Sequence, residues 1–87
     1  MNSFENIEKL IQVLEEKGPI FQEQLIELYC NNQPQEKERE IADKLLADID
    51  TMRVWNMLDR KKYPLIVISE EGNRQIQEVR RRKIKYL

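Results

Sequence analysis

The chain has 87 residues, of which 40% are hydrophobic and 36% are charged, and its formal net charge is −1. This length is that of one small domain, which we place over residues 1–87. The many spaced Leu, Ile and Val residues exclude a disordered or collagen-like chain. With one Cys and no His, the chain has almost no residues for a zinc site or a nucleophile–base pair. We therefore expect no enzyme activity, no catalytic residue, no metal and no cofactor.

Features of secreted or membrane proteins are missing from the sequence. Cys30 is the single cysteine, so no internal disulfide can form, and the N-terminal stretch has neither the basic start nor the apolar run of a signal peptide. The longest apolar run, Leu65–Ile68, is far shorter than the roughly 20 residues that span a bilayer. We expect a cytoplasmic protein without a membrane partner.

The small net charge hides a strong asymmetry between the two halves of the chain. Residues 1–52 carry five Lys or Arg against twelve Asp or Glu, a net charge of −7. Residues 53–87 carry ten Lys or Arg against four Asp or Glu, a net charge of +6. A split of this size is informative about binding partners rather than about the fold.

Apolar residues at spacings of three and four predict helices over residues 3–17, 21–30 and 35–51. Gly18-Pro19 ends the first helix, and Asn31-Asn32 ends the second, because Asn tolerates the left-handed conformation. The stripes are Phe4, Ile7, Leu10, Ile11, Val13 and Leu14, then Leu25, Ile26, Leu28 and Tyr29, then Ile41, Ala42, Leu45, Leu46, Ile49 and Met52.

From Arg53 onward the apolar period changes to two, which predicts a β-hairpin with strands over 53–59 and 64–69. The basic residues 60–62 form its turn, and the β-branched run Leu65–Ile68 suits a buried return strand. Ser69 is a good N-cap for a last helix over 70–85.

This order of elements resembles the winged helix-turn-helix superfamily. Gly18-Pro19-Ile20 with Leu25-Ile26 resembles the entry to that family's second helix. Ile68-Ser69-Glu70-Glu71-Gly72 resembles the "Leu-Thr-Glu-Glu-Gly" phrase of PadR-like and MarR-like bacterial regulators. The resemblance implies an α+β, mainly α fold of three helices, a two-stranded wing and a C-terminal helix. It also implies a homodimeric transcriptional regulator of bacterial or phage origin that binds double-stranded DNA.

In this superfamily the third helix enters the major groove and the wing contacts phosphate or the minor groove. Here, however, residues 36–50 have a net charge of −3, so the third helix repels DNA on average. Lys37, Arg39 and Lys44 could still reach bases or phosphates. The favoured explanation of this face is a solvated surface with pairs such as Glu40–Lys44. The candidate DNA-binding residues are Lys37, Arg39, Lys44, Arg53, Arg60, Lys61, Lys62, Arg80 and Arg81.

The basic segments also have simpler explanations. Positive charge in a hairpin turn protects an edge strand from aggregation, and the run 80–83 suits the C-terminal end of a helix. The dimer candidates come from the first and last helices, where the first helix matches a heptad seam. They are Phe4, Ile7, Ile11, Ile76, Val79, Ile84, Tyr86 and Leu87.

Two functions are therefore open. One is a small homodimeric DNA-binding regulator that holds phosphates through its wing and C-terminal helix. The alternative is a winged-helix protein-interaction module, an adaptor or inhibitor that uses the acidic third helix and does not bind DNA directly.

Overall fold

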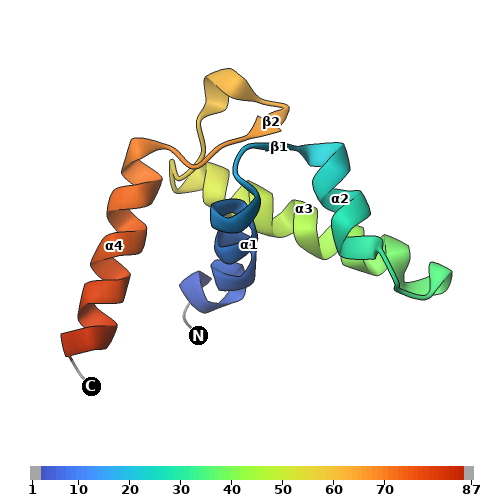
Figure 1. Ribbon diagram of the computed structural model, residues 1–87, viewed down its shortest axis with the longest axis horizontal. Coiled ribbons are helices and arrows are strands. Elements are labelled where there is room, and N and C mark those ends of the chain that lie inside the picture. Colours follow the sequence, from blue (N-terminus) through green and yellow to red (C-terminus); the bar gives the residue numbers. More distant parts are fainter. Residues whose placement is uncertain (1–2, 86–87) are drawn as a thin grey trace.

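The chain folds into a mainly helical structure with a small antiparallel sheet (Figure 1). The structure is a computed structural model that describes residues 3–85. Its elements are α1 (Ser3–Lys17), β1 (Ile20–Phe21), α2 (Gln22–Cys30), the 3₁₀ turn η1 (Gln35–Lys37), α3 (Glu38–Val54), the 3₁₀ turn η2 (Arg60–Lys62), β2 (Leu65–Ile66) and α4 (Glu70–Lys85). The bounds predicted for the first and last helices are confirmed, and α2 begins one residue later than predicted. The predicted third helix over 35–51 is a 3₁₀ turn over 35–37 followed by α3, which ends three residues later than predicted.

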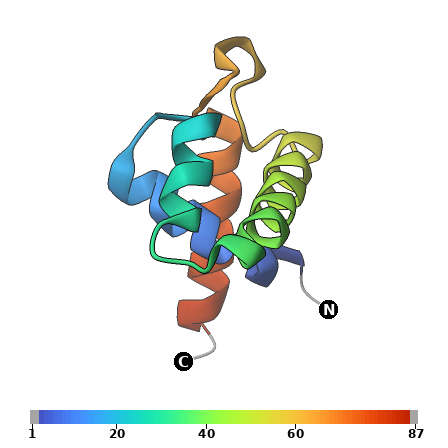
Figure 2. The ribbon, with the colours of Figure 1, turned by 90° about the vertical axis from the view of Figure 1, so that its right-hand side faces the viewer.

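One hydrophobic core lies between the helices and beneath the sheet. The apolar stripe of α1 is buried against Leu25 of α2 and against Leu45, Ile49 and Met52 of α3. From α4, Ile76 is also buried in this core, with 2% of its surface exposed. Figures 1 and 2 show α1, α2 and α3 gathered around one another, with α4 set off to one side of α1.

Four of the predicted dimer residues belong to this core, so their assignment to a dimer surface is wrong. Phe4, Ile7, Ile11 and Ile76 are all buried within a single chain, because a domain this small has few other apolar side chains with which to form its interior. Val79 is half-buried against the same cluster. The side chain of Ile84, together with Tyr86 and Leu87, lies outside the described residues. Homodimerisation stays a prediction, but these four residues are no longer candidates for its interface.

The sheet joins two segments that are far apart in the sequence. Ile20 of β1 lies opposite Ile66 of β2, and Phe21 lies opposite Leu65. The N–H of Gln22 continues the ladder by donating to the carbonyl oxygen of Pro64, at 3.1 Å. The predicted return strand over 64–69 is therefore present in shortened form, and its strand partner is the link between the first two helices.

The predicted first strand over 53–59 is wrong, because α3 continues to Val54 and then ends in a Schellman motif. The N–H of Met57 donates to the carbonyl oxygen of Met52 (2.8 Å), and that of Asn56 donates to Arg53 (3.0 Å). Asn56 has φ of 60°, which is the left-handed conformation that this motif requires. Both Met52 and Met57 are fully buried, which supplies the hydrophobic contact that accompanies such ends.

The predicted hairpin is reduced to a single bridge between Leu58 and Ile68. Two backbone hydrogen bonds flank the bridge, from the Asp59 N–H to the Val67 oxygen and from the Ser69 N–H to the Met57 oxygen, each 2.8 Å long. The hairpin therefore closes at its base, while the residues between form the turn η2 rather than two long strands.

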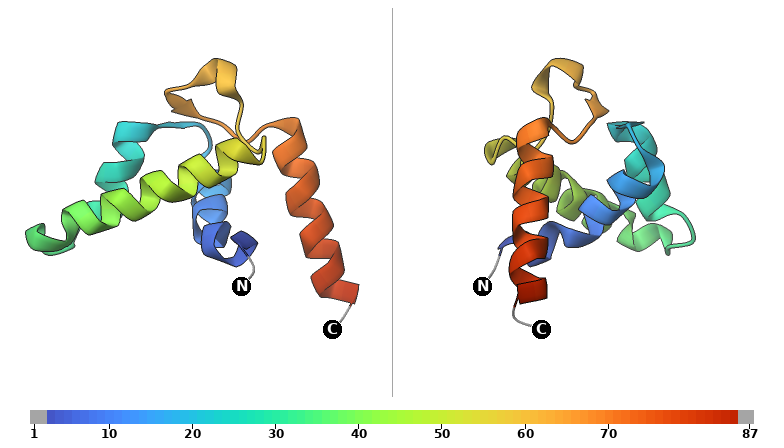
Figure 3. Two further views of the ribbon diagram at one scale, coloured as in Figure 1. Left: turned by 180° about the vertical axis from the view of Figure 1, so that it is seen from behind. Right: turned by 60° about the vertical axis from the view of Figure 1, so that its left-hand side comes forward.

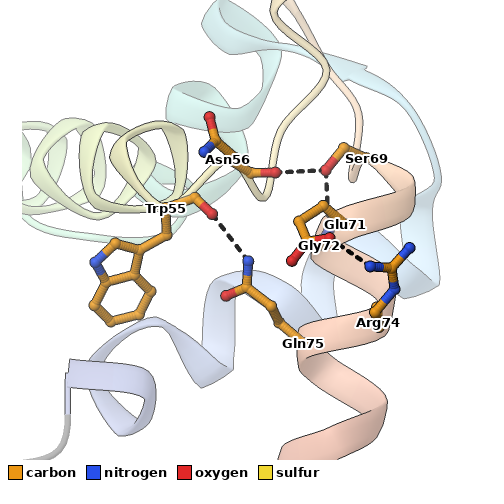
Figure 4. Close-up of polar contacts among 7 residues, drawn as sticks. All are labelled: Trp55, Asn56, Ser69, Glu71, Gly72, Arg74 and Gln75. Carbon is orange, nitrogen blue, oxygen red and sulfur yellow. Dashed lines mark hydrogen bonds and ion pairs between the residues drawn. The ribbon is translucent and has the colours of Figure 1, made fainter.

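The start of α4 is fixed against the end of α3 (Figure 4). Ser69 is the predicted N-cap, and its Oγ accepts a hydrogen bond from the Gly72 N–H at 2.9 Å. The same hydroxyl donates to the carbonyl oxygen of Asn56 at 2.7 Å. One turn later, Gln75 Nε2 donates to the carbonyl oxygen of Trp55 at 2.9 Å. These bonds satisfy backbone groups at both helix ends, where the helix itself leaves them without partners.

Candidate nucleic-acid interface

An exposed concentration of positive charge lies in residues 59–64, which we call the basic loop. It contains η2, and the Asp59 carboxylate begins this turn by accepting a hydrogen bond from the Lys61 N–H at 3.1 Å. The side chains of Arg60, Lys61 and Lys62 are exposed. Figures 1 and 2 show the loop projecting from the body at the end opposite the C-terminal end of α4. Its position leaves it free to approach a large partner.

Two arginines and a tyrosine are organised at the base of this loop. The Arg53 guanidinium, from the last turn of α3, lies over the Tyr63 ring with 4.6 Å between its central carbon and the ring centroid. This distance is within the range of a cation–π contact. Arg60 Nη2 donates to the carbonyl oxygen of Arg53 at 3.1 Å. The last turn of α3 thus contacts Arg60, the first residue of η2, and Tyr63, the residue that follows η2.

These residues border a shallow groove of about 330 Å³, lined by Arg53, Val54, Arg60 and Tyr63. None of the four is acidic. Val54 is 66% exposed and Tyr63 is 48% exposed, so the groove combines two cations with an accessible apolar side chain and an accessible aromatic ring. We call it the Arg53–Tyr63 groove.

The exposed face of α3 has the opposite charge. Glu40, Asp43 and Asp50 are exposed along it, with Arg39 near its start and the partly exposed Leu46 between them. In the left panel of Figure 3 this helix crosses the front of the molecule beneath the basic loop. A DNA duplex placed against α3 would therefore meet carboxylates along much of the helix.

Lys44 forms an ion pair with Asp48, at 3.1 Å between Nζ and Oδ2. The predicted Glu40–Lys44 pair is thus replaced by a pair one turn further along. An opposing carboxylate neutralises Lys44, which makes it a weaker phosphate ligand than its sequence position indicates.

The remaining candidate cations do not join the basic loop. Lys37 and Arg39 lie at the other end of α3, about 20 Å from Arg53 at a rise of ~1.5 Å per residue. The basic run of α4 lies toward the helix end that points away from the loop (Figure 1). Of the nine predicted DNA-binding residues, only Arg53, Arg60, Lys61 and Lys62 are brought together.

Within the α4 run, Arg80 is held by Glu15 of α1. Arg80 Nη1 lies 3.0 Å from Glu15 Oε2, and Nη2 bonds the other oxygen. These hydrogen bonds lower the pKa of Glu15 and raise that of Arg80. Arg82 pairs with Glu78 at 3.7 Å, whereas Arg81 is exposed. Arg80 thus has an intramolecular partner, which competes with phosphate for its guanidinium, and its DNA contact stays a prediction.

A second concavity of about 200 Å³ lies between α1, α2 and α3, lined by Lys9, Leu10, Tyr29, Ile41, Lys44, Leu45 and Asp48. Lys9 Nζ lies 5.3 Å from the centroid of the Tyr29 ring. The Tyr29 hydroxyl is buried without a hydrogen-bond partner among the described residues, and burial together with the Asp48 charge raises its pKa. Because Lys44 already pairs with Asp48, this concavity offers less free charge than the Arg53–Tyr63 groove.

No protein-family model, curated protein or solved structure matches the chain. Within residues 3–85, no helix is long and apolar enough to cross a membrane. The same residues contain no cluster of three or more potential metal ligands of the His, Cys, Asp or Glu type.

Reasoning from sequence missed the contribution of Val54 and Tyr63. The alternating pattern assigns Val54 to a strand, and Tyr63 is not among the candidate DNA-binding residues. Asn56 is the sequence feature that indicates the end of the helix, since Asn is a common residue at the left-handed position after a helix. Assigning Asn56 to that position keeps Arg53 and Val54 on α3 and next to the turn. Trp55, in contrast, packs against the core.

Proposed function

We propose that this protein is a small winged-helix DNA-binding protein that holds phosphates through its basic loop. Three helices, a short sheet strand between the first two, and a loop that returns to the sheet before a last helix are compatible with a winged helix. In this interpretation the basic loop is the wing. Its exposed Arg60, Lys61 and Lys62 carry the proposal, because Lys and Arg that neutralise phosphates release counterions and so provide affinity for any DNA sequence.

The proposed mode of binding differs from major-groove reading by the third helix. The carboxylates along α3 disfavour deep entry of this helix into a groove lined by phosphates. Arg53 at its C-terminal end lies next to the basic loop and supplies a further cation there. Contacts to phosphate position a protein on DNA without reading the base sequence. We therefore expect weak sequence preference and a regulatory role that depends on occupancy or on partners.

A salt titration tests this function. Affinity for a mixed-sequence duplex, measured by fluorescence anisotropy, should fall steeply as the salt concentration rises. The double variant Lys61→Gln/Lys62→Gln should flatten the slope of log K against log salt by about 2, since each phosphate contact contributes ~0.9. A matched control is Lys9→Gln, which removes a cation from α1, away from the loop. Absence of binding by the unaltered protein at about 50 mM salt would reject the proposal, because phosphate contacts are strongest at low salt.

A second candidate function is a protein-interaction module that uses the outer face of α3. The exposed Leu46 near the acidic side chains of Glu40, Asp43 and Asp50 favours it, because this face combines apolar area with mainly negative charge that a basic partner would complement. Charge reversal in Glu40→Lys/Asp43→Lys separates the two functions. It should strengthen DNA binding if α3 lies near phosphates, and should abolish partner capture if α3 is the docking surface.

A further inference from the structure

We propose that the Arg53–Tyr63 groove binds an unpaired base of single-stranded DNA, with the base stacked on the Tyr63 ring. The inference rests on the proposed function, because the basic loop would supply the phosphate contacts for the same strand. It goes further in naming the form of DNA that the site prefers.

The first argument is the state of the Tyr63 ring. Tyr63 as a whole residue is 48% exposed, and the Arg53 guanidinium lies over its ring at 4.6 Å and holds it in place. An aromatic side chain fixed before binding loses little conformational entropy when a ligand stacks on it. Every base has a π-face, so such a platform accepts bases of any sequence.

The second argument is the chemistry around the ring. Val54 offers exposed apolar surface in the same groove, which suits the flat face of a base rather than a phosphate. Arg60 uses Nη2 to bond the Arg53 carbonyl, and a guanidinium has further N–H donors that remain able to bind a phosphate oxygen. Lys61 and Lys62 continue the positive track along the loop. The groove and the loop thus offer an apolar and aromatic surface to a DNA base and cations to the phosphates of the same strand.

The third argument separates a single strand from a duplex. In a duplex the base faces are stacked on one another and only their edges are accessible in the grooves. A duplex lying on α3 would also bring phosphates toward Glu40, Asp43 and Asp50, which are exposed. A single strand can follow the basic loop with less exposure to these carboxylates, although Asp50 lies one turn before Val54 and is the nearest opposing charge on α3.

The test compares a fluorescein-labelled oligothymidine with a blunt mixed duplex of equal length by anisotropy at about 150 mM salt, near physiological ionic strength. The unaltered protein should bind the oligothymidine more tightly. Tyr63→Ala should weaken that binding about tenfold or more, the loss typical of one stacked base, with much less effect on the duplex. Tyr63→Phe should keep the preference, because stacking requires the ring and not the hydroxyl.

The charge variant Lys61→Gln/Lys62→Gln provides the matched comparison. It should weaken single-stranded and duplex binding by similar factors, because phosphates are common to both. The circular dichroism spectrum and melting temperature of each variant establish that it is folded. If Tyr63→Ala does not fold, Tyr63→Trp decides: a larger ring should bind the oligothymidine at least as tightly and raise its preference over the duplex.

The outcomes distinguish this inference from the proposed function. Binding of neither DNA at low salt rejects both. Equal affinity for the two DNAs, or equal weakening of both by Tyr63→Ala, rejects base stacking while leaving phosphate binding by the loop intact. A strong single-strand preference that is lost in Tyr63→Ala and kept in Tyr63→Phe supports the inference.

Discussion

The Arg80 guanidinium binds the Glu15 carboxylate through two hydrogen bonds, although the residues are 65 positions apart in the chain. This pair ties the middle of α4 to the C-terminal part of α1. Both side chains remain partly exposed, at 51% and 37% of their surface. Solvent screening therefore limits the contribution of the pair to the free energy of unfolding to about 0–1 kcal/mol.

The Glu15–Arg80 pair predicts a pH-dependent effect of Glu15→Gln. The Arg80 hydrogen bonds lower the pKa of Glu15 in the folded chain. A carboxyl of this kind stabilises the fold at pH values above its unfolded pKa of about 4, and the contribution is lost as pH falls through the folded pKa. Glu15→Gln should therefore lower the free energy of unfolding by up to ~1 kcal/mol at pH 7, with a much smaller effect in strong acid.

Urea denaturation at neutral and acidic pH measures this difference. Glu16→Gln is the matched control, because Glu16 is an exposed neighbour on the same helix, and it should change stability little at either pH. An equal loss for Glu15→Gln at both pH values would show that packing, and not the ion pair, is responsible.

Gly72 allows α4 to approach the end of α3, and Gly72→Ala should disrupt this contact. An added Cβ would collide with the carbonyl oxygen of Met57 and lie 2.9 Å from both Met57 Cα and Ile68 Cγ2. Backbone atoms cannot move aside as a flexible side chain does, so we expect a loss of about 1–3 kcal/mol. Thermal denaturation measures it. The exposed neighbour Asn73→Ala should stay within ~0.5 kcal/mol of the unaltered protein, and a similar result for Gly72→Ala would contradict the close approach.

Asn56 ends α3 in the left-handed conformation, with φ of 60°. Asn56→Ala should cost about 1–2 kcal/mol, because a Cβ disfavours this conformation in most residues. Asn56→Gly should be neutral or stabilising, since glycine adopts it freely. Chemical denaturation of both variants tests the Schellman end. If Asn56→Gly destabilises as much as Asn56→Ala, the Asn side chain itself is required and the backbone explanation is wrong.

Tyr29→Phe should leave stability unchanged or increase it. The Tyr29 hydroxyl is buried and has no hydrogen-bond partner among the described residues, and a buried unsatisfied polar group costs about 1–3 kcal/mol. Removing the hydroxyl keeps the ring on which Lys9 lies. The melting temperature of Tyr29→Phe measures the effect, with Tyr29→Leu as the variant that also loses the ring. A clear decrease for Tyr29→Phe would show that the hydroxyl has a stabilising partner.

Local pattern was enough to predict most of the helices. The three-and-four spacing of α1 and the Ser69 cap of α4 depend on nearby residues, and both helices have the predicted bounds. The end of α3 was not predicted, because Val54, Asn56 and Leu58 alternate as a strand would. The left-handed conformation of Asn56 is stabilised by the burial of Met57 and by the hydroxyl of Ser69. The spacing of apolar residues around Asn56 does not reveal either contact.

The candidate site was predictable in charge but not in arrangement. The basic residues 60–62 stand out in the sequence, whereas the partner of Arg80 lies on a helix at the other end of the chain. An apolar stripe likewise shows that Ile7 and Ile11 are buried but not which surface buries them. The contact between Arg53 and Tyr63 required both the extra turn of α3 and the position of the loop.

The hydrogen bonds at the base of the basic loop allow the length and sequence of the loop to vary. The Ser69 N–H and Oγ bond the Met57 and Asn56 carbonyls, so the loop ends are joined independently of its tip. Lengthening a loop that is closed in this way costs only about 0.6 kcal/mol per doubling of its length. The tip can therefore diversify during evolution, or accept grafted sequences in the laboratory, while the helical scaffold stays the same.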